Sequence, residues 1–251
     1  AVGWTGIANV MTGKVSPSGH TVDTYAANSL SSPAITYAAG NAMDWTNKDW
    51  LLANATDNDG NGTNILHYTI YAEGIYIGYK WYETADAEGY WDAESNEHGT
   101  GYDAVVQYPF GYGLSYTSFD WKVTDATANG SALTKDGNVT VKVAVTNTGD
   151  RAGKDVVQLY YTAPYTAGEI EKSSVELGAF AKTKELAPGE SEEVTLTVPV
   201  SDMASYDAYD ANHNNFTGYE LDAGDYIFTV RHNAHDVDAA ANATITCNLP
   251  S

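Results

Sequence analysis

The sequence predicts a chain in two parts, an α/β segment over residues 1–118 followed by an all-β sandwich over residues 119–251. Three observations support this division. Apolar residues at helical spacing occur near the start of the chain. Strict alternation of apolar and polar residues begins only after Phe119, and turn signals then recur at short intervals.

The segment WTGIANVMT, residues 4–12, predicts a short helix. Ile7, Val10 and Met11 fall at the spacing that places them on one helical face. Gly13 follows directly, at a position where helices commonly end in a left-handed residue. We therefore expect the helix to end at Gly13.

The chain between this helix and the sandwich has a weaker pattern. Residues 28–67 are rich in Asn, Asp, Gly and Thr, so we expect a long loop with one short helix near residues 47–55. The segment TIYAEGIYIGYKWYE, residues 69–83, has β-branched and aromatic residues around two glycines. Periodicity alone fits either a helix or a strand there, and we expect a mixture.

The second part shows the period of two that is typical of strands. Val139, Val141, Val143 and Val145 alternate with polar residues, which places all four on one face. Seven short strands separated by turns are typical of an immunoglobulin-like or fibronectin-type sandwich. The predicted strands are residues 119–124, 139–147, 155–164, 173–183, 192–200, 224–232 and 243–249.

The charge of the chain excludes two classes of partner. Lys and Arg number 12 against 33 Asp and Glu, which gives a formal net charge of −21. A phosphate backbone or an anionic lipid surface would be repelled, so we expect neither nucleic acid nor a membrane as partner. Cys247 is the only cysteine, so no internal disulfide can form, and both a bacterial cytoplasm and secretion stay open.

Three long motifs, followed by a fourth, carry a resemblance to a known family. They are GWTGIANVMTGKVSPSGHTVDTYA, YAEGIYIGYKWYET, VVQYPFGYGLSYTSF and VTNTGDRAGKDVVQLYYTAP. Their order resembles that in family-three glycoside hydrolases, the β-glucosidase and β-xylosidase group. The resemblance implies that residues 1–118 are a partial sandwich segment, the latter part of an α/β sandwich domain. It implies that residues 119–251 are a fibronectin-type-III-like β-sandwich.

The same resemblance implies a retaining hydrolysis of β-glycosides, which needs two carboxyl groups and no cofactor. In the family, the nucleophile lies on a (β/α)8 barrel, and the acid/base Glu lies upstream of the segment that matches residues 3–13. We therefore expect no catalytic residue in this chain, which starts like the middle of a longer protein. The expected partners are the barrel and the start of the sandwich domain, as another chain or as the remainder of the polypeptide.

Two details refine the resemblance. The phrases GHTVDTYA and DAYDANHNNFTGYELDAGDYIFTVRHNAHDV are most similar to a subgroup in which the sandwich and fibronectin-like domains precede the barrel. The family usually has Arg at the positions of His20 and Lys80. Lys and neutral His cannot grip a carboxylate with two parallel bonds as Arg can, so ion pairs carried there in relatives are in doubt here.

One loop is a candidate for contact with a β-glycoside substrate. In WDAESNEHGTG, Trp91 could offer a flat face to a sugar ring, and Glu94, Glu97 and His98 could reach a neighbouring active site. We take Trp91, Glu94 and His98 as the candidate substrate-binding residues. An ordinary surface loop is the alternative.

Two other pairs of residues are candidates for a site, one of carboxylates and one of histidines. Glu73 and Glu83 could serve in acid/base work, but pairing with Lys80 or solvation is the simpler interpretation. His232 and His235, with acidic neighbours, would lie on opposite faces of a strand end, so we expect surface residues there and no metal.

One loop is a candidate for calcium binding. Residues Asp57 to Asn64 match the first half of an EF-hand loop. Position twelve is Tyr68 where a bidentate Glu is needed, so an Asx-rich turn is the alternative.

Two functions from different classes follow. The chain is either a non-catalytic portion of a retaining β-glycosidase, most simply a β-glucosidase, or an independent carbohydrate-binding or surface-interaction sandwich. The 19 Tyr and 6 Trp residues support the second. A homo-oligomer is compatible with both functions.

The aromatic stretch YPFGYGLSYTSF, residues 108–119, is expected to bury its rings between the two parts of the chain.

Overall fold

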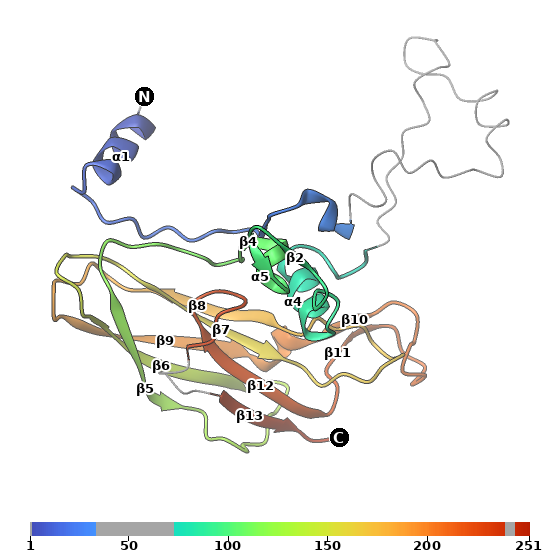
Figure 1. Cartoon of the computed structure of the whole chain (residues 1–251). Helices are drawn as coiled ribbons and strands as arrows, with labels where there is room; N and C mark the ends of the chain where they lie inside the picture. Colours follow the sequence, from blue (N-terminus) through green and yellow to red (C-terminus); the bar gives the residue numbers. More distant parts are fainter. Residues whose placement is uncertain (1, 34–72, 239–243) are drawn as a thin grey trace, which may run out of the picture.

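The structure is a computed structural model that describes residues 2–33, 73–238 and 244–251. Figure 1 shows two facing β-sheets, with a small helical lobe on one side and a helix that projects away from them. The predicted helix near residues 47–55 and the Asp57–Asn64 loop lie outside the described residues. Within the described ranges, none of the helices is long and apolar enough to cross a membrane.

The sandwich consists of two antiparallel sheets. The three-stranded sheet has the order β5-β6-β9, and the four-stranded sheet has the order β13-β12-β7-β8. All seven predicted strands are formed. Their bounds are β5 Phe119–Ala126, β6 Asn138–Asn147, β7 Val156–Thr162, β8 Glu176–Lys182, β9 Ser191–Pro199, β12 Gly224–Arg231 and β13 Thr244–Leu249.

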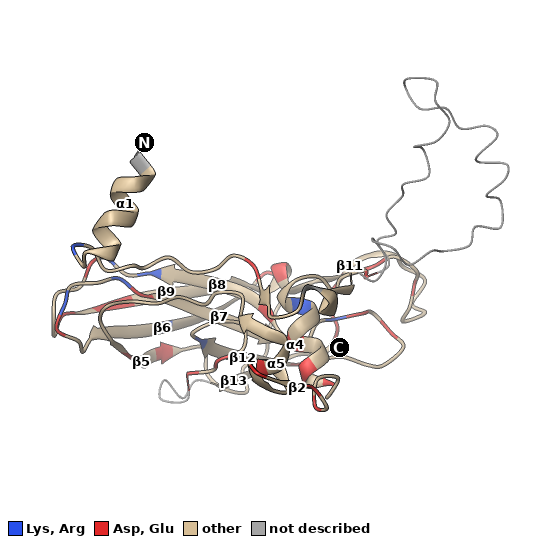
Figure 2. Cartoon of the chain, turned by 45° about the horizontal axis from the view of Figure 1, so that its top comes forward, with Lys and Arg blue, Asp and Glu red and all other residues tan. Residues whose placement is uncertain are grey.

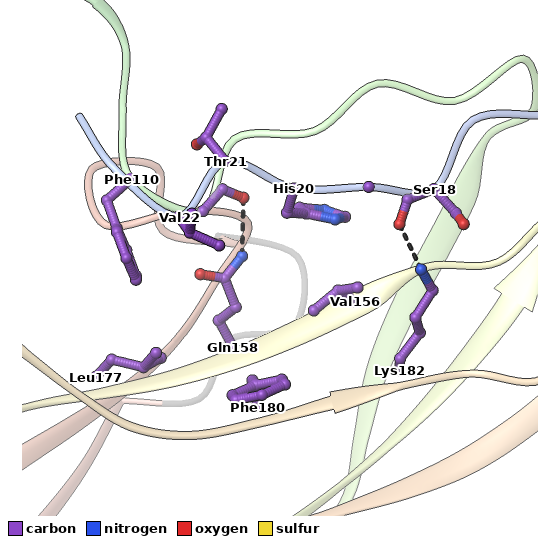
Figure 3. Close-up of a pocket in the computed structure, with 12 residues that line it drawn as sticks. Ser18, His20, Thr21, Val22, Phe110, Val156, Gln158, Leu177, Phe180 and Lys182 are labelled. Carbon is purple, nitrogen blue, oxygen red and sulfur yellow. Dashed lines mark hydrogen bonds between the residues drawn. The ribbon is translucent and has the colours of Figure 1, made fainter. Parts of the chain in front are cut away.

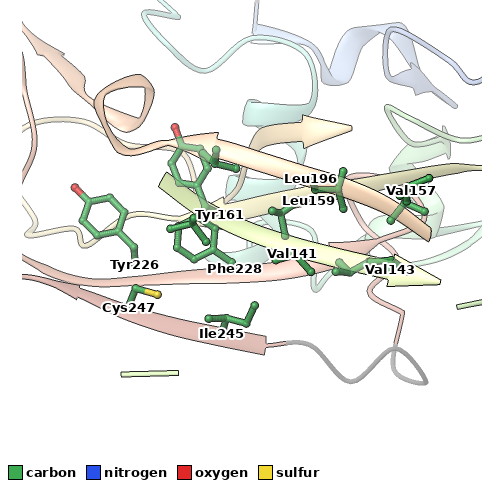
Figure 4. Packing of buried hydrophobic residues seen from close by; sticks show 14 of the residues in the cluster. Val141, Val143, Val157, Leu159, Tyr161, Leu196, Tyr226, Phe228, Ile245 and Cys247 are labelled. Atoms are coloured by element: carbon green, nitrogen blue, oxygen red, sulfur yellow. The ribbon is translucent and has the colours of Figure 1, made fainter. Parts of the chain in front are cut away.

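The core lies between the two sheets. The four alternating valines of β6 are fully buried, as the period of two predicts. They face Val157, Leu159 and Phe228 from the other sheet (Figure 4). Each apolar side chain of this size contributes roughly 1.5–3 kcal/mol when it leaves water, so this core holds the sandwich together.

One hairpin of the sandwich was not predicted. β10, Ser205–Asp207, pairs with β11, Gly218–Glu220, after a short 3-10 helix η2, Val200–Met203. Both strands have three residues and are separated by a loop rich in Asn and Asp. Such short strands carry too few alternating positions to be recognised from the sequence.

The N-terminal helix forms as predicted. α1, Val2–Met11, is followed by Gly13 in the left-handed region, with φ 71°. The Gly13 N–H donates to the Val10 carbonyl at 2.9 Å, which closes the last turn. Trp4 and Met11 are almost fully exposed, so the apolar residues of α1 contact little of the described chain.

A small lobe packs against the four-stranded sheet. It contains the 3-10 helix η1 (Ser29–Ser31) and the elements β1 (Tyr25–Ala26), α4 (Tyr79–Ala87), β2 (Ser95–Asn96), β3 (Gly99–Thr100), α5 (Tyr102–Val105) and β4 (Val106–Tyr108). β1 pairs with β4, and β2 with β3. The lobe has its own apolar cluster, which includes Tyr82, Trp91 and Val105. The part of TIYAEGIYIGYKWYE that begins at Tyr79 is therefore helical.

The aromatic stretch 108–119 is only in part a buried seam. Phe110 packs on Tyr79, with ring centroids 4.7 Å apart, and Phe119 packs against the sandwich core. Tyr108 and Tyr116 stay 40% and 43% exposed, so the expectation was wrong for these two rings. The Tyr108 ring contacts the rings of Tyr25 and Tyr112, and the Tyr116 hydroxyl donates to the Val10 carbonyl of α1.

Candidate functional site

Four aromatic side chains from α4 and the turn that follows it form a cluster. Trp81 and Tyr82 belong to the helix, and Tyr90 and Trp91 follow it after the turn at Gly89. The Tyr90 and Trp91 rings meet edge-on with centroids 4.8 Å apart, and Trp81 meets Trp91 at 5.9 Å. Edge-to-face contacts of this kind fix the rings relative to one another.

Hydrogen bonds anchor the two indoles. Trp91 Nε1 donates to the Tyr82 carbonyl at 3.2 Å, and Trp81 Nε1 donates to the Ser31 carbonyl at 3.0 Å. The hydroxyls of Ser31 and Tyr82 lie 3.0 Å apart. Both indole N–H groups are thus used inside the lobe, and the aromatic cluster is a rigid wall.

A cavity of about 410 Å³ opens beside this wall. Glu94 and Asn96 bring polar groups to it, and Trp81, Tyr90 and Trp91 bring ring surface. Rigid aromatic surface with a few polar groups is the usual lining of a small-molecule site. The other described lining residues are Asn28, Leu30, Ser31, Pro33, Ala104 and Val105.

Of the three predicted substrate-binding residues, two lie together and one lies apart. Trp91 and Glu94 line the same cavity, and His98 lies at the tip of the β2–β3 turn outside its described lining. Trp91 is only 4% exposed, whereas Tyr90 is 66% exposed. The ring that is open to a ligand is therefore Tyr90, which the sequence analysis did not single out. The sequence feature that could have indicated Tyr90 is its position directly before Trp91, in a loop with several acidic residues.

A second cavity of about 470 Å³ lies on the other side of Trp81 and Tyr90, which line both. It is formed between the lobe and the loop after β7, with Tyr76, Tyr165 and Lys172 in its wall. Lys172 is buried and pairs with Asp222, so its charge is neutralised within the sandwich.

A third cavity, of about 240 Å³, separates residues 18–22 from β7 and β8 (Figure 3). Its walls are mainly apolar, and Phe180 and Val156 form part of them. Burial lowers the pKa of His20 on its upper side. Lys182 Nζ donates to the Ser18 carbonyl at 2.6 Å, which ties this segment to β8.

The contacts of Glu83 show that two expectations were wrong, its pairing with Lys80 and the surface position of His235. Lys80 pairs with Glu176 of β8 at 3.0 Å and not with Glu83, so Lys at this position still makes an ion pair. Glu83 is buried, accepts a hydrogen bond from the Tyr102 hydroxyl at 2.5 Å and lies 3.0 Å from His235 Nδ1. His235 is thus not a plain surface residue, because the loop after β12 folds back onto α4.

The histidine that was grouped with His235 lies apart from it. His232 is exposed and pairs with Asp238 at 2.9 Å, and its ring lies 4.1 Å from that of Trp121. The two histidines therefore face different parts of the molecule.

Two carboxylates are buried among the described residues, Glu83 and Asp207. Asp207 accepts hydrogen bonds from the backbone N–H groups of Tyr209 and Ala211, at 2.9 and 2.7 Å. Both carboxylates are used to hold the protein together. Figure 2 shows that the acidic residues of the described chain are distributed over both the sheets and the lobe.

The sequence is similar to a known domain family and to two β-glucosidases. The fibronectin type III-like domain family matches residues 155–234. The chain is 35% identical over 232 residues to β-glucosidase A of Butyrivibrio fibrisolvens, covering 88% of this chain and 23% of the relative. It is 34% identical over 226 residues to a β-glucosidase of Ruminococcus albus, covering 90% and 18%.

A solved structure gives the same result in three dimensions. The chain superimposes on a β-glucosidase of Paenibacillus barengoltzii with a TM-score of 0.68 and 33% identity, covering 98% of this chain and 22% of that one. The chain thus spans about a fifth of the length of the relatives that it matches.

Proposed function

Because the chain is homologous to part of the β-glucosidases of glycoside hydrolase family 3, we propose that it is a non-catalytic portion of such an enzyme. The complete enzyme would hydrolyse terminal β-linked sugars on a (β/α)8 barrel. The observation that carries the proposal is the coverage: nearly all of this chain matches only about a fifth of each relative.

The surface of the lobe and of α1 supports a further domain as neighbour. Large apolar side chains are exposed there, both aliphatic and aromatic, as in the interior of a divided domain. They include Trp4, Ile7, Met11, Val22, Tyr25, Leu30, Ile77 and Leu114. We propose that residues 1–118 are the latter part of an α/β sandwich domain whose remainder covers these side chains.

The boundary at residue 118 and the permuted order of domains stay predictions. β5 begins at Phe119, which agrees with a fibronectin-type-III-like domain over residues 119–251. In this arrangement the sandwich would brace the lobe, and the lobe would form part of the wall of the substrate cleft.

We propose that the loop carrying Trp91, Glu94 and His98 is the part of the lobe nearest the sugar. The cavity between the aromatic wall and Glu94 supports this, because it combines ring surface with a carboxylate. With Trp91 buried, its part is to hold Tyr90 in place, and Glu94 would accept hydrogen bonds from sugar hydroxyls. His98, on an exposed turn, would contact the substrate from the rim.

The proposal is tested by an assay of the purified chain on p-nitrophenyl-β-glucoside, with circular dichroism to show that the sandwich is folded. We expect no hydrolysis. Turnover by a homogeneous 26.9 kDa species would overturn the proposal.

The loop is tested separately, after grafting the chain into a relative that is active. Glu94→Gln and His98→Ala should raise KM more than kcat falls, because they remove contacts to bound sugar. Glu185→Gln, an exposed carboxylate between β8 and β9, is the matched control and should change neither constant. If all three variants behave alike, the loop has no contact with substrate.

A further inference from the structure

The loop of the β10–β11 hairpin has an unusual backbone. Asp210, His213 and Asn215 have φ values of 54°, 58° and 66°. Left-handed backbone is unfavourable for a residue with a Cβ, and here three such residues occur within six positions. Such a conformation persists only where the surrounding contacts fix it.

Acidic and amide side chains fix this loop from within. The buried Asp207 carboxylate holds two backbone N–H groups, and Asp210 Oδ1 accepts a hydrogen bond from the Asn215 N–H at 2.9 Å. Glu220 Oε2 accepts hydrogen bonds from the amide groups of Asn212 and Asn214. The loop is therefore ordered before any partner arrives, and binding to it would cost little conformational entropy.

The fixed hairpin displays four aromatic rings to solvent. Tyr206 and Tyr219 lie directly opposite each other in the strand pair, with ring centroids 5.0 Å apart. The exposed fractions are 59% for Tyr206, 92% for Tyr209, 52% for Phe216 and 74% for Tyr219. Four exposed aromatic side chains within residues 206–219 exceed the single scattered apolar residues of an ordinary protein surface.

The composition of the patch indicates its partner. All large apolar side chains exposed between residues 201 and 222 are aromatic, whereas aliphatic and aromatic ones mix on the lobe and α1. Pyranose rings stack their C–H faces on aromatic rings, so a patch whose large apolar side chains are all aromatic suits a sugar chain. Residues 201–230 contain no Lys or Arg, so an anionic partner finds no countercharge there.

We propose that the β10–β11 hairpin is a binding surface for a neutral glycan chain, with Tyr206 and Tyr219 as its centre. It is separate from the cavity beside Trp91, whose described lining residues lie between Asn28 and Val105. The surface concerns binding and not hydrolysis, so it does not depend on the presence of a catalytic barrel. Its natural role would be to hold the enzyme on a polysaccharide.

The test is affinity gel electrophoresis of the 251-residue chain. The gels contain barley β-glucan or glycogen, both neutral, or polygalacturonate as an anionic control. We expect retardation by at least one neutral glycan and none by polygalacturonate. Tyr206→Ala and Tyr219→Ala should each weaken binding about tenfold, and Tyr219→Phe should keep it, because the ring and not the hydroxyl carries the stacking.

Phe180→Ala is the matched control, since Phe180 is an exposed ring on β8 of the same sandwich. It should leave the retardation unchanged. The proposal is overturned if no neutral glycan retards the chain, or if Phe180→Ala weakens binding as much as Tyr219→Ala does. It is also overturned if the tyrosine variants instead abolish a dimer of this chain in light scattering, which would make the hairpin a self-association surface.

Discussion

The carboxylate of Glu83 in α4 and the imidazole of His235 after β12 lie 3.0 Å apart and join the helical lobe to the sandwich. The Tyr102 ring stacks on the imidazole, with centroids 3.7 Å apart and planes 8° from parallel. The Ala234 N–H next to it donates to the Phe110 carbonyl at 2.9 Å. These contacts hold the loop after β12 against α4 and α5.

This contact predicts a pH-dependent stability. Burial by itself lowers the pKa of His235, but the hydrogen bond and charge of Glu83, with the charges of Asp86 and Asp236, outweigh it and raise the pKa above 6.5. A group whose pKa is raised on folding stabilises the fold below its unfolded pKa, and that stabilisation is lost as pH rises through the folded value. We expect His235→Asn to lower the free energy of unfolding by about 1 kcal/mol more at pH 6 than at pH 9, since the pair is partly exposed.

Urea unfolding of the wild type and of His235→Asn at both pH values measures this difference. The comparison between the two proteins cancels the titration of other groups, such as Asp86, whose own pKa is raised by burial. A difference in unfolding free energy that does not change with pH would contradict the assigned ion pair.

Gly111 predicts a specific steric effect. A Cβ at this position would lie 2.2 Å from Gln158 Oε1, and φ is +82°. Gln158 is buried and donates hydrogen bonds to the Gly111 and His232 carbonyls at 3.0 and 2.7 Å. Gly111→Ala must displace this amide, so it should lower the free energy of unfolding by about 3 kcal/mol.

Gly130→Ala is the control that measures the cost of the left-handed backbone conformation without a steric clash. Gly130 has nearly the same φ, +83°, but a Cβ there meets no atom within 4 Å. It should therefore cost only about 1 kcal/mol, as the left-handed conformation requires. Equal losses in the two variants, measured by urea unfolding, would show that the Gln158 contact has no effect.

For the ion pair between Lys172 and Asp222, we expect removal of one partner to destabilise the fold more than removal of both. Lys172 is 5% exposed at its side chain, and its ammonium also donates to the Ile170 carbonyl at 3.4 Å. Lys172→Met should lower the free energy of unfolding by about 2 kcal/mol because it leaves the Asp222 carboxylate without its partner. Adding Asp222→Leu to that variant should recover most of the loss.

An exposed ion pair supplies the comparison. Lys184 lies 2.7 Å from Glu190, and both side chains are open to solvent. Lys184→Met should leave the thermal unfolding midpoint unchanged within error, because surface pairs are screened. If it destabilises the chain as much as Lys172→Met does, burial is not what makes the Lys172 pair important.

The sandwich could be predicted from the sequence because its signals are local. Alternation in β6 places Val139 to Val145 in the core without knowledge of any distant residue. Gly13 at the end of α1 is a local signal of the same kind. The β10–β11 hairpin was missed because its loop is held by hydrogen bonds that the carboxylates of Asp207 and Glu220 accept, and no short sequence pattern indicates these bonds.

The site could be predicted only in part, because its contacts join distant segments. Lys80 is three residues from Glu83 and was its expected partner, yet β8 supplies Glu176 to Lys80 and the loop after β12 supplies His235 to Glu83. The Trp91 loop was singled out because aromatic and acidic residues are adjacent in it, and its contact with substrate stays a prediction. Which ring is open depends on the packing of Tyr82 against Trp91, and that follows only from the fold.

As a proposed structural portion of a family 3 β-glucosidase, this chain should be interchangeable with the matching segment of a relative. The most direct measurement replaces the matched segment of the Ruminococcus albus β-glucosidase, aligned over 226 residues, with this chain. Hydrolysis of p-nitrophenyl-β-glucoside should be abolished when the segment is deleted and restored by the graft. A folded graft without activity, or a deletion variant that remains fully active, would contradict the claim.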